Sequence, residues 1–326
     1  MTSSQPASYL IVGAGVFGVS TALHLAAQHP ESRITLVDRD GLNPEADART
    51  PRVAASWDWN KVVRADYTDV AYCALALEAR DVWRGTNSSL SSSSPPFYDI
   101  FPPFYRESGI YWISPSTKGF ARAVLENYRR LGREKEIEDG VVRLVPIDEA
   151  RQLYGGVFAE ADYAGVDKVL VNEGSGWADA RAALRRGIER ARELGVELVT
   201  AEVEALQFED GDLGPEGGGK VCVGVRTKGG SVIRATRTIL STGSYTPKLL
   251  DESAERSGIE DLRAGERIVA AGVTTGLTVL NEEDMARFSG MPVGIQENPP
   301  ERGKVCEIAV RDSRYMYPSR MRTSHH

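Results

Sequence analysis

The first forty residues alternate between apolar runs and a stretch of good helix formers. Residues 9–12, Tyr-Leu-Ile-Val, are uniformly apolar, which is typical of a strand buried on both faces of a parallel sheet. Residues 15–27 favour a helix with apolar residues on an inner face. A second apolar run, 33–37, ends in Asp38. The pattern predicts a strand, a helix and a second strand of an α/β fold.

Helix-like and strand-like patterns continue along the chain. Residues 117–131 and 178–194 have apolar residues at helical spacing, so we expect two amphipathic helices there. The many arginines and glutamates of the second favour a solvated face over a binding patch. The glycine-rich stretch 211–220 predicts a hairpin loop between two strands, and the serine-rich stretch 87–96 predicts a flexible loop.

Composition narrows the class of protein. The chain has 326 residues, enough for two domains, and its net charge of −7 comes without a basic block for nucleic acid. No apolar run reaches the roughly 18 residues that span a membrane, and the N-terminus lacks the features of a signal peptide. The three cysteines, Cys73, Cys222 and Cys306, are far apart, which argues against a disulfide framework or a metal site. We therefore expect a cytoplasmic protein that binds neither nucleic acid, membrane nor metal.

Three glycines between the first strand and the first helix form a G-x-G-x-x-G pattern. Gly13 permits a tight turn, Gly15 lets backbone N–H groups approach a pyrophosphate, and Gly18 lets the helix pack closely on the strand. The helix N-terminus carries a partial positive charge that favours phosphate. Asp38 follows Gly18 by 20 residues, where a carboxylate accepts hydrogen bonds from an adenosine ribose. The context favours a dinucleotide site over a tight turn without a ligand.

The glycine pattern alone does not separate NAD from FAD. A further segment places Ser56 where it can cap a helix, with Asp58 in the first turn. Lys61 and Arg64 are three residues apart and would share one face of that helix. Two cations beside a cofactor site suggest a bound anion. A solvated basic edge that pairs with nearby acids explains the spacing equally well.

The segments, taken in order, resemble a known family. It is the flavin-dependent amine oxidases that include monomeric sarcosine oxidase, pipecolate oxidase, fungal saccharopine oxidases and fructosyl amino acid oxidases. The resemblance covers about residues 9–250 and becomes patchy afterwards. The segments that carry it are GAGVFG with Asp38, the S-x-D-x-N-K-V-V-R-x-x-Y stretch 56–67, and residues 103–114, 172–206 and 237–250.

The resemblance implies an FAD cofactor and a Rossmann-like fold of the glutathione-reductase type, with an added α+β substrate domain. The FAD-binding domain would comprise residues 1–86 and 165–250, and the substrate domain residues 87–164 and 251–310. The positions that match the family's cofactor contacts are Gly13, Ala14, Gly15, Val16, Phe17, Gly18, Asp38, Arg39, Ser56, Asp58, Lys61, Val203, Ser241, Thr242 and Gly243.

The resemblance also implies a reaction. The family oxidises the C–N bond of a secondary amine and passes the electrons to oxygen, which gives hydrogen peroxide. Lys61 matches a cation beside the flavin ring, Arg64 the residue that grips a substrate carboxylate, and Lys304 a lysine that faces the flavin. An arginine at position 64 favours an N-substituted amino acid such as sarcosine, pipecolate or saccharopine over a fructosyl amino acid. The expected partners are this small amine and oxygen, and we expect a monomer.

The end of the chain does not fit the resemblance. The family continues past residue 326, with a late glycine-rich turn and a cysteine that links the flavin. Residues 311–326 resemble neither, so we expect a C-terminally truncated member with an unstructured or aberrant tail. Cys306 is better explained as a buried structural thiol. Some members are peroxisomal, but no targeting tripeptide ends this chain. An inactive flavin-binding remnant and a pyridine-nucleotide dehydrogenase remain the alternatives.

Overall fold

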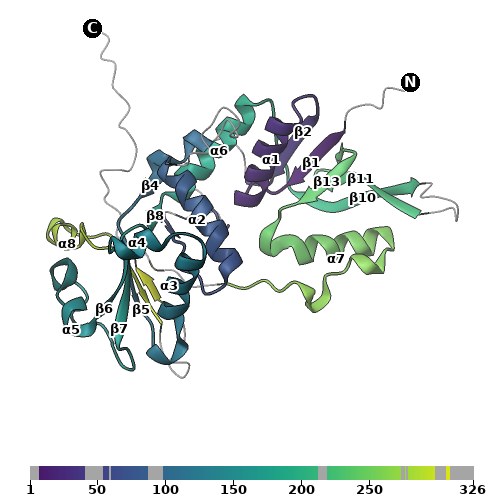
Figure 1. Cartoon of the computed structure of the whole chain (residues 1–326). Helices are drawn as coiled ribbons and strands as arrows, with labels where there is room; N and C mark the ends of the chain where they lie inside the picture. The colour runs from purple at the N-terminus through teal and green to yellow at the C-terminus, as the bar shows by residue number, and fades with distance from the viewer. Residues whose placement is uncertain are drawn as a thin grey trace, which may run out of the picture. The chain divides into compact units, whose positions relative to one another are not determined.

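The computed structural model describes residues 7–40, 54–58, 60–86, 98–211, 219–272, 276 and 278–297, and the backbone of 306–308. The fold belongs to the α/β class, and the chain divides into two compact units (Figure 1). The first unit comprises Met1–Trp59, Ser89–Ile100 and Ala180–Thr275, and the second comprises Asn60–Ser88, Phe101–Asp179 and Gly276–His326. Residues 60–86 and 165–179, predicted for the FAD-binding domain, belong to the second unit. No described helix is both long and apolar enough to cross a membrane.

A four-stranded parallel sheet forms the centre of the first unit. Its order is β13-β1-β2-β9, with β1 at Ser8–Val12, β2 at Arg33–Asp38, β9 at Glu197–Thr200 and β13 at Arg237–Leu240. Val12 pairs with Leu240 and Val37, and Asp38 pairs with Thr200. The carboxyl ends of all four strands therefore meet at one edge of the sheet. The two strands predicted from the apolar runs are confirmed.

Helix α1 (Val16–Gln28) packs on this sheet, and helix α6 (Ala180–Glu193) packs on α1 (Figure 1). Both helices match their predicted ranges. The inner face of α1 buries Val19, Ala22 and Leu23, at the helical spacing of the sequence pattern. Gly187 of α6 faces Val19, since a Cβ there would lie 2.9 Å from its side chain.

A small antiparallel sheet completes the first unit. Strands β10 (Val203–Gly211) and β11 (Gly219–Thr227) pair as the predicted hairpin, and β12 (Val232–Arg234) joins β11. The residues between β10 and β11 lie outside the described part of the chain. Helix α7 (Thr246–Ser257) packs against β10.

The second unit contains two further sheets. The five-stranded sheet has the order β15-β14-β5-β7-β6, and the three-stranded sheet the order β3-β8-β4. The helix predicted at 117–131 is confirmed as α3 (Phe120–Arg130). The remaining helices described are α2 (Val70–Arg84), α4 (Glu134–Glu138), α5 (Ile147–Ala150) and α8 (Glu282–Phe288). The strands are β3 (Lys61–Val63), β4 (Tyr105–Arg106), β5 (Ile110–Ile113), β6 (Val142–Pro146), β7 (Lys168–Asn172), β8 (Gly176–Ala178), β14 (Val293–Gln296) and β15 (Cys306–Ile308).

The helix expected around Ser56 and Arg64 is wrong. Residues 61–63 form strand β3, in which Lys61 pairs with Ala178 of the antiparallel strand β8. Two adjacent valines favour extended backbone, and the pairing with β8 satisfies their backbone groups. Successive side chains of a strand alternate between faces, so Lys61 and Arg64 do not share a helical face.

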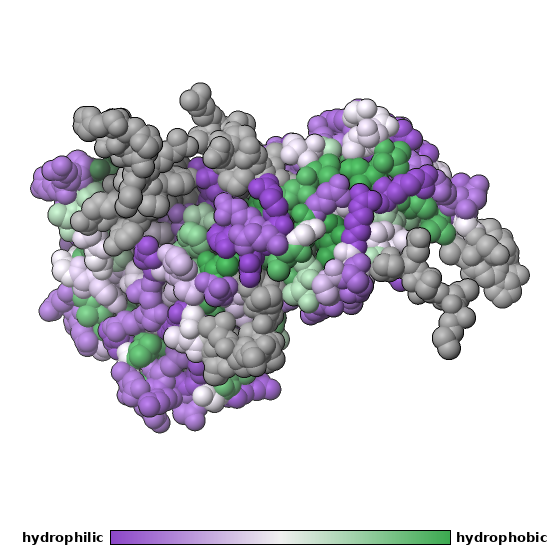
Figure 2. Space-filling view, turned by 90° about the horizontal axis from the view of Figure 1, so that it is seen from above, coloured by the Kyte–Doolittle hydropathy of each residue, from purple (hydrophilic) through white to green (hydrophobic). Residues whose placement is uncertain are grey.

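The face in Figure 2 carries both hydrophilic and hydrophobic residues, with the hydrophobic ones gathered in patches. Exposed large apolar side chains occur in both units. Phe17 at the start of α1 is 79% exposed, and Tyr72 and Leu75 on α2 are 64% and 63% exposed. Single exposed apolar side chains are normal on a protein surface, whereas a contiguous group of them marks a surface where a ligand or partner can bind. The serine-rich stretch 87–96, Lys304 and residues 311–326 lie outside the described residues.

Candidate functional site

The turn after β1 requires a glycine at its first position. Gly13 has a φ of +101°, and its N–H donates to the carbonyl oxygen of Val37 at 2.8 Å. A Cβ on Gly13 would lie 2.5 Å from the carbonyl oxygen of Ser241. Both the backbone conformation and the close approach of Ser241 exclude a side chain here.

The other two glycines have different surroundings. A Cβ on Gly18 would lie 1.8 Å from the carbonyl oxygen of Gly13, so α1 packs directly on the turn. A Cβ on Gly15 would have the Oγ of Ser56 at 3.3 Å as its one neighbour within 4 Å among the described residues. Gly13 and Gly18 therefore shape the turn, whereas Gly15 leaves room beside the helix N-terminus. This division is the one that a bound pyrophosphate requires.

The N-terminus of α1 is suited to an anion. Its first turn contains no acidic residue, so no side chain of the helix itself offsets the partial positive charge at this end. The Oγ of Ser56 accepts a hydrogen bond from the N–H of Val16 at 2.9 Å. Ser56 thus lies against the start of α1 and does not cap a helix of its own. Asp58 is nearby in the chain, and its carbonyl accepts from the N–H of Arg181 at 3.1 Å.

Asp38 lies at the end of β2, beside the glycine turn. One carboxylate oxygen accepts from the N–H of Ala14 at 2.8 Å, and the other accepts from the N–H of Asp40 at 2.9 Å. Each carboxylate oxygen has a second lone pair, which can accept from a hydroxyl group. The carboxylate is therefore fixed in place and still able to bind a ribose.

Arg39 is held by an aromatic ring. Its guanidinium donates to the hydroxyl of Tyr245 at 2.9 Å and lies 4.1 Å from the centre of that ring. Tyr245 is half exposed and follows the turn 241–243, in which Gly243 has a φ of +55°. Sequence reasoning did not single out Tyr245, because its role depends on a contact with a residue 206 positions away.

The remaining candidates of the first unit lie at the same sheet edge. The N–H of Ser241 donates to the carbonyl of Val12 at 2.8 Å, and the Thr242 hydroxyl bonds that of Thr246 at 2.8 Å. The N–H of Ala201 donates to the carbonyl of Asp38 at 2.9 Å, which brings the chain leading to Val203 past the end of β2. Ligands of open α/β sheets bind at the carboxyl ends of the strands. The structure therefore brings the cofactor candidates of the first unit together at the edge where a dinucleotide would bind.

Lys61 and Arg64 belong to the second unit. Lys61 is exposed on β3. The guanidinium of Arg64 lies 4.3 Å from the ring centre of Tyr67 and 4.5 Å from that of Trp112. One of its N–H groups donates at 2.6 Å to the backbone carbonyl of Asp66 and not to the carboxylate of that residue. Two rings and one hydrogen bond fix the orientation of this cation.

A buried polar network lies next to Arg64. The fully buried carboxylate of Asp66 accepts from the amide of Asn172 at 2.7 Å and from the hydroxyl of Ser175 at 3.3 Å. Burial raises the pKa of Asp66 above its ordinary value, while these hydrogen bonds and the nearby arginines act in the opposite direction. The Asn172 amide also donates to the hydroxyl of Tyr128 at 3.0 Å.

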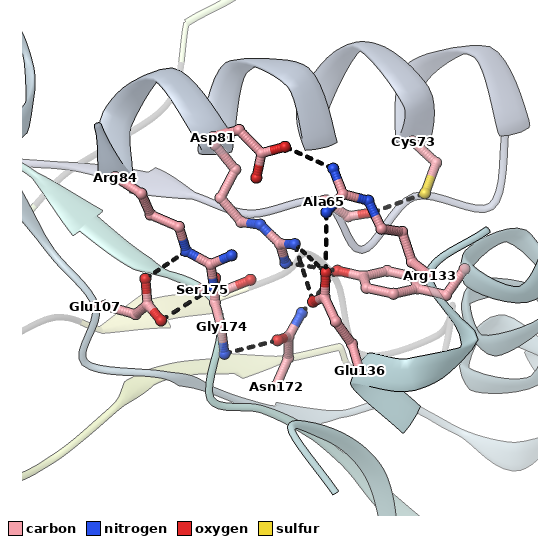
Figure 3. Close-up of polar contacts among 12 residues, drawn as sticks. Ala65, Cys73, Asp81, Arg84, Glu107, Arg133, Glu136, Asn172, Gly174 and Ser175 are labelled. Atoms are coloured by element: carbon pink, nitrogen blue, oxygen red, sulfur yellow. Dashed lines mark hydrogen bonds and ion pairs between the residues drawn. The ribbon is translucent and has the colours of Figure 1, made fainter. Parts of the chain in front are cut away.

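Ion pairs enclose this network. Figure 3 shows Asn172 beside Gly174, and Arg84 between Gly174 and Glu107. The buried Arg80 donates to Glu136 at 2.6 and 2.9 Å. Sequence reasoning missed these residues. The polar Asn172 at the end of an apolar run was the available signal, because a buried amide needs partners.

The comparisons with known proteins decide between the two dinucleotides. Residues 8–299 match the model of the FAD dependent oxidoreductase family, DAO. The chain belongs to this family. FAD is the family's cofactor, so the alternative of a pyridine-nucleotide dehydrogenase is set aside.

Two curated relatives of this chain are oxidases. The chain is 28% identical to L-saccharopine oxidase of Schizosaccharomyces pombe over 290 residues, 87% of this chain and 59% of the relative. It is 31% identical to the amino acid oxidase FsqB of Aspergillus fumigatus over 280 residues, 77% of this chain and 52% of the relative. The chain therefore spans between half and three fifths of these relatives.

Solved structures share the fold. A modified fructosyl peptide oxidase from Aspergillus nidulans matches with a TM-score of 0.61 at 21% identity, over 94% of this chain and 65% of that one. The deglycating enzyme fructosamine oxidase from Aspergillus fumigatus matches with a TM-score of 0.59 at 24% identity, over 93% and 62%. The predicted fold class is confirmed.

Proposed function

We propose that this FAD-dependent oxidoreductase oxidises the C–N bond of a secondary amine in an N-substituted amino acid. The substrate gives up two electrons and two protons, and water then hydrolyses the imine to an amine and a carbonyl compound. Oxygen accepts the two electrons and two protons and becomes hydrogen peroxide. The names of the relatives, a saccharopine oxidase and amino acid oxidases, support a substrate of this class.

The observation that carries the proposal is the setting of Arg64. Its guanidinium is held between Tyr67 and Trp112 and uses one N–H for the carbonyl of Asp66. An arginine has five N–H donors, and with the described residues this guanidinium forms no hydrogen bond beyond that one, which leaves donors for a ligand. A carboxylate can accept two of them in parallel, which fixes both its position and its orientation. This suits the α-carboxylate of an amino acid.

The first unit would hold the cofactor through its own residues. The space beside Gly15 at the N-terminus of α1 would receive the pyrophosphate, and the fixed carboxylate of Asp38 would accept from the ribose hydroxyls. When bound, FAD supplies the two-electron chemistry, and the protein binds, orients and supplies charge. We propose that Lys61 stabilises the negative charge that develops as oxygen is reduced. The assignment of residues 1–86 and 165–250 to FAD binding, the monomeric state and a cytoplasmic location also remain proposals.

The proposal is tested by cofactor identification and a peroxide screen. The protein is purified, its flavin is released by heat or proteolysis and identified, and peroxide is measured with sarcosine, pipecolate, saccharopine and a fructosyl amino acid. Peroxide with one of the first three supports the proposal. Bound flavin without peroxide from any amine supports the alternative of an inactive flavin-binding remnant.

A further inference from the structure

The second unit contains a hollow that the residues beside Arg64 share with one face of α2. Its volume is about 490 Å³. Pockets for small ligands commonly measure about 300–1,000 Å³, so a substituted amino acid fits within it. The lining residues are Val62, Val63, Arg64, Tyr67, Tyr72, Leu75, Ala76, Ala79 and Trp83.

Helix α2 has two apolar faces, and one of them lines this hollow. Cys73 and Leu77 are buried in the core of the second unit. Tyr72, Leu75 and Trp83 recur at helical spacing on the other face. The ring centres of Trp83 and Phe101 lie 5.3 Å apart, so these two rings are packed together. The large exposed fractions of Tyr72 and Leu75 leave their side chains available to a ligand. Together, Tyr72, Leu75 and Trp83 form an apolar stripe along α2, and such a stripe indicates a binding surface better than scattered apolar residues do.

The lining has one charge and little further polarity. Arg64 is the single ionisable cation among the described residues that line the hollow, and the tips of Tyr67, Tyr72 and Trp83 are the other polar side-chain groups. An occupant that complements this lining carries one carboxylate for Arg64 and an apolar or aromatic body for the rest. A second carboxylate or a chain of hydroxyl groups would lose water without gaining an ionic partner there.

We propose that the hollow binds the body of the substrate and selects an amino acid with an apolar or aromatic side chain. The α-carboxylate pairs with Arg64, and the side chain lies over Tyr72, Leu75 and Trp83. This inference rests on the proposed function, because it takes the Arg64 ligand to be the substrate carboxylate. It goes further by disfavouring substrates with a second acidic group or a sugar chain.

The inference is tested by equilibrium binding of unreactive carboxylates, which needs no turnover. Isothermal calorimetry compares phenylacetate, acetate and succinate on the purified protein with its flavin bound. Burial of a phenyl ring should make phenylacetate bind about tenfold or more tightly than acetate. Succinate should gain no advantage over acetate. Equal affinities for phenylacetate and acetate would overturn the apolar selection while leaving the proposed amine oxidation intact.

Variants locate the binding. Leu75→Asp should weaken phenylacetate binding about tenfold and leave acetate unchanged, because it places a charge beside the ring and not beside the carboxylate. Ala71→Asp adds the same charge to an exposed position of α2 outside the lining, and its affinities should equal those of the parent. Phenylacetate binding that Leu75→Asp does not change would overturn the proposal.

Arg64→Met separates the two parts of the ligand. It should weaken phenylacetate about ten- to hundredfold and leave the neutral benzyl alcohol unchanged. If the protein forms peroxide from sarcosine but binds none of these probes, the hollow is not the substrate site, and the proposed function still holds. If Leu75→Asp instead changes the oligomeric state measured by light scattering, the stripe covers a protein contact and the inference fails.

Discussion

Replacing Gly18 by alanine should lower the stability of the protein, whereas replacing Gly15 by alanine should weaken its binding of FAD. A Cβ on Gly18 would lie 1.8 Å from the carbonyl oxygen of Gly13, whereas ordinary contact begins at 3.4 Å. Helix α1 and the turn would have to part by about 1.6 Å. A Cβ on Gly15 meets the Oγ of Ser56 at 3.3 Å, which a small rotation of a serine side chain can relieve.

These distances translate into different free energies. Overpacking costs about 1–3 kcal/mol, and a weakened hydrogen bond between the N–H of Gly13 and the carbonyl of Val37 adds about 1 kcal/mol. We therefore expect Gly18→Ala to lower the free energy of unfolding by about 3 kcal/mol, and Gly15→Ala by less than about 1 kcal/mol. The methyl group of Gly15→Ala would occupy space that a pyrophosphate oxygen needs. Loss of one charge-assisted hydrogen bond corresponds to a ten- to hundredfold weaker affinity for FAD.

Two assays on the same variants check both expectations. Urea unfolding of the protein without flavin measures stability, and quenching of flavin fluorescence measures the affinity for FAD. Gly272→Ala is the control, because a Cβ there meets no described atom within 4 Å. A Gly18→Ala protein as stable as the parent would refute the packing argument. A Gly15→Ala protein that binds FAD like the parent would refute the placement of the pyrophosphate.

Three further predictions concern the acid at the strand end, the two cations and the buried carboxylate. Asp38→Ala should weaken FAD binding about tenfold in the same quenching assay, because the ribose hydroxyls lose an acceptor. Arg64→Met should raise KM for the amino acid and slow reduction of the flavin, whereas Lys61→Met should slow only reoxidation of the flavin. Stopped-flow measurement of the two half-reactions separates these effects, and the reverse pattern would contradict both roles. Burial raises the pKa of Asp66 in the folded protein above the ordinary carboxyl value of about 4. The protonated carboxyl therefore stabilises the folded state fully below that ordinary value, and this contribution is lost as the pH rises through the pKa of the folded state. Urea unfolding should show the parent losing stability relative to Asp66→Asn between acidic and neutral pH, and parallel pH profiles would exclude Asp66 as the cause.

The sequence predicts the first unit well because its signals are local. Gly13, Gly18 and Asp38 lie within one strand-helix-strand segment, and the structure places Gly13 at positive φ and Gly18 against the turn. Burial on both faces of a parallel strand leaves a clear apolar run in the sequence. The hairpin glycines are equally local, since the two strands they connect are adjacent in the chain.

The second unit was harder to predict because its key contacts are distant in sequence. Lys61 and Arg64 have helical spacing, but pairing with β8, more than a hundred residues later, makes the segment extended. Asp66 meets Asn172 and Ser175 across 106 and 109 residues, and no short pattern marks such contacts. Tertiary pairing therefore overrode a local helical signal.

Anaerobic titration of the flavin-loaded protein with N-methyl amino acids tests the central claim most directly. The claim is that this FAD-dependent oxidoreductase removes two electrons from a carboxylate-bearing secondary amine. We predict that N-methylphenylalanine bleaches the flavin absorbance, that air restores it, and that the same bleaching is much slower in Arg64→Met. A flavin that stays oxidised with every N-methyl amino acid, in a protein that retains its FAD, would contradict the account.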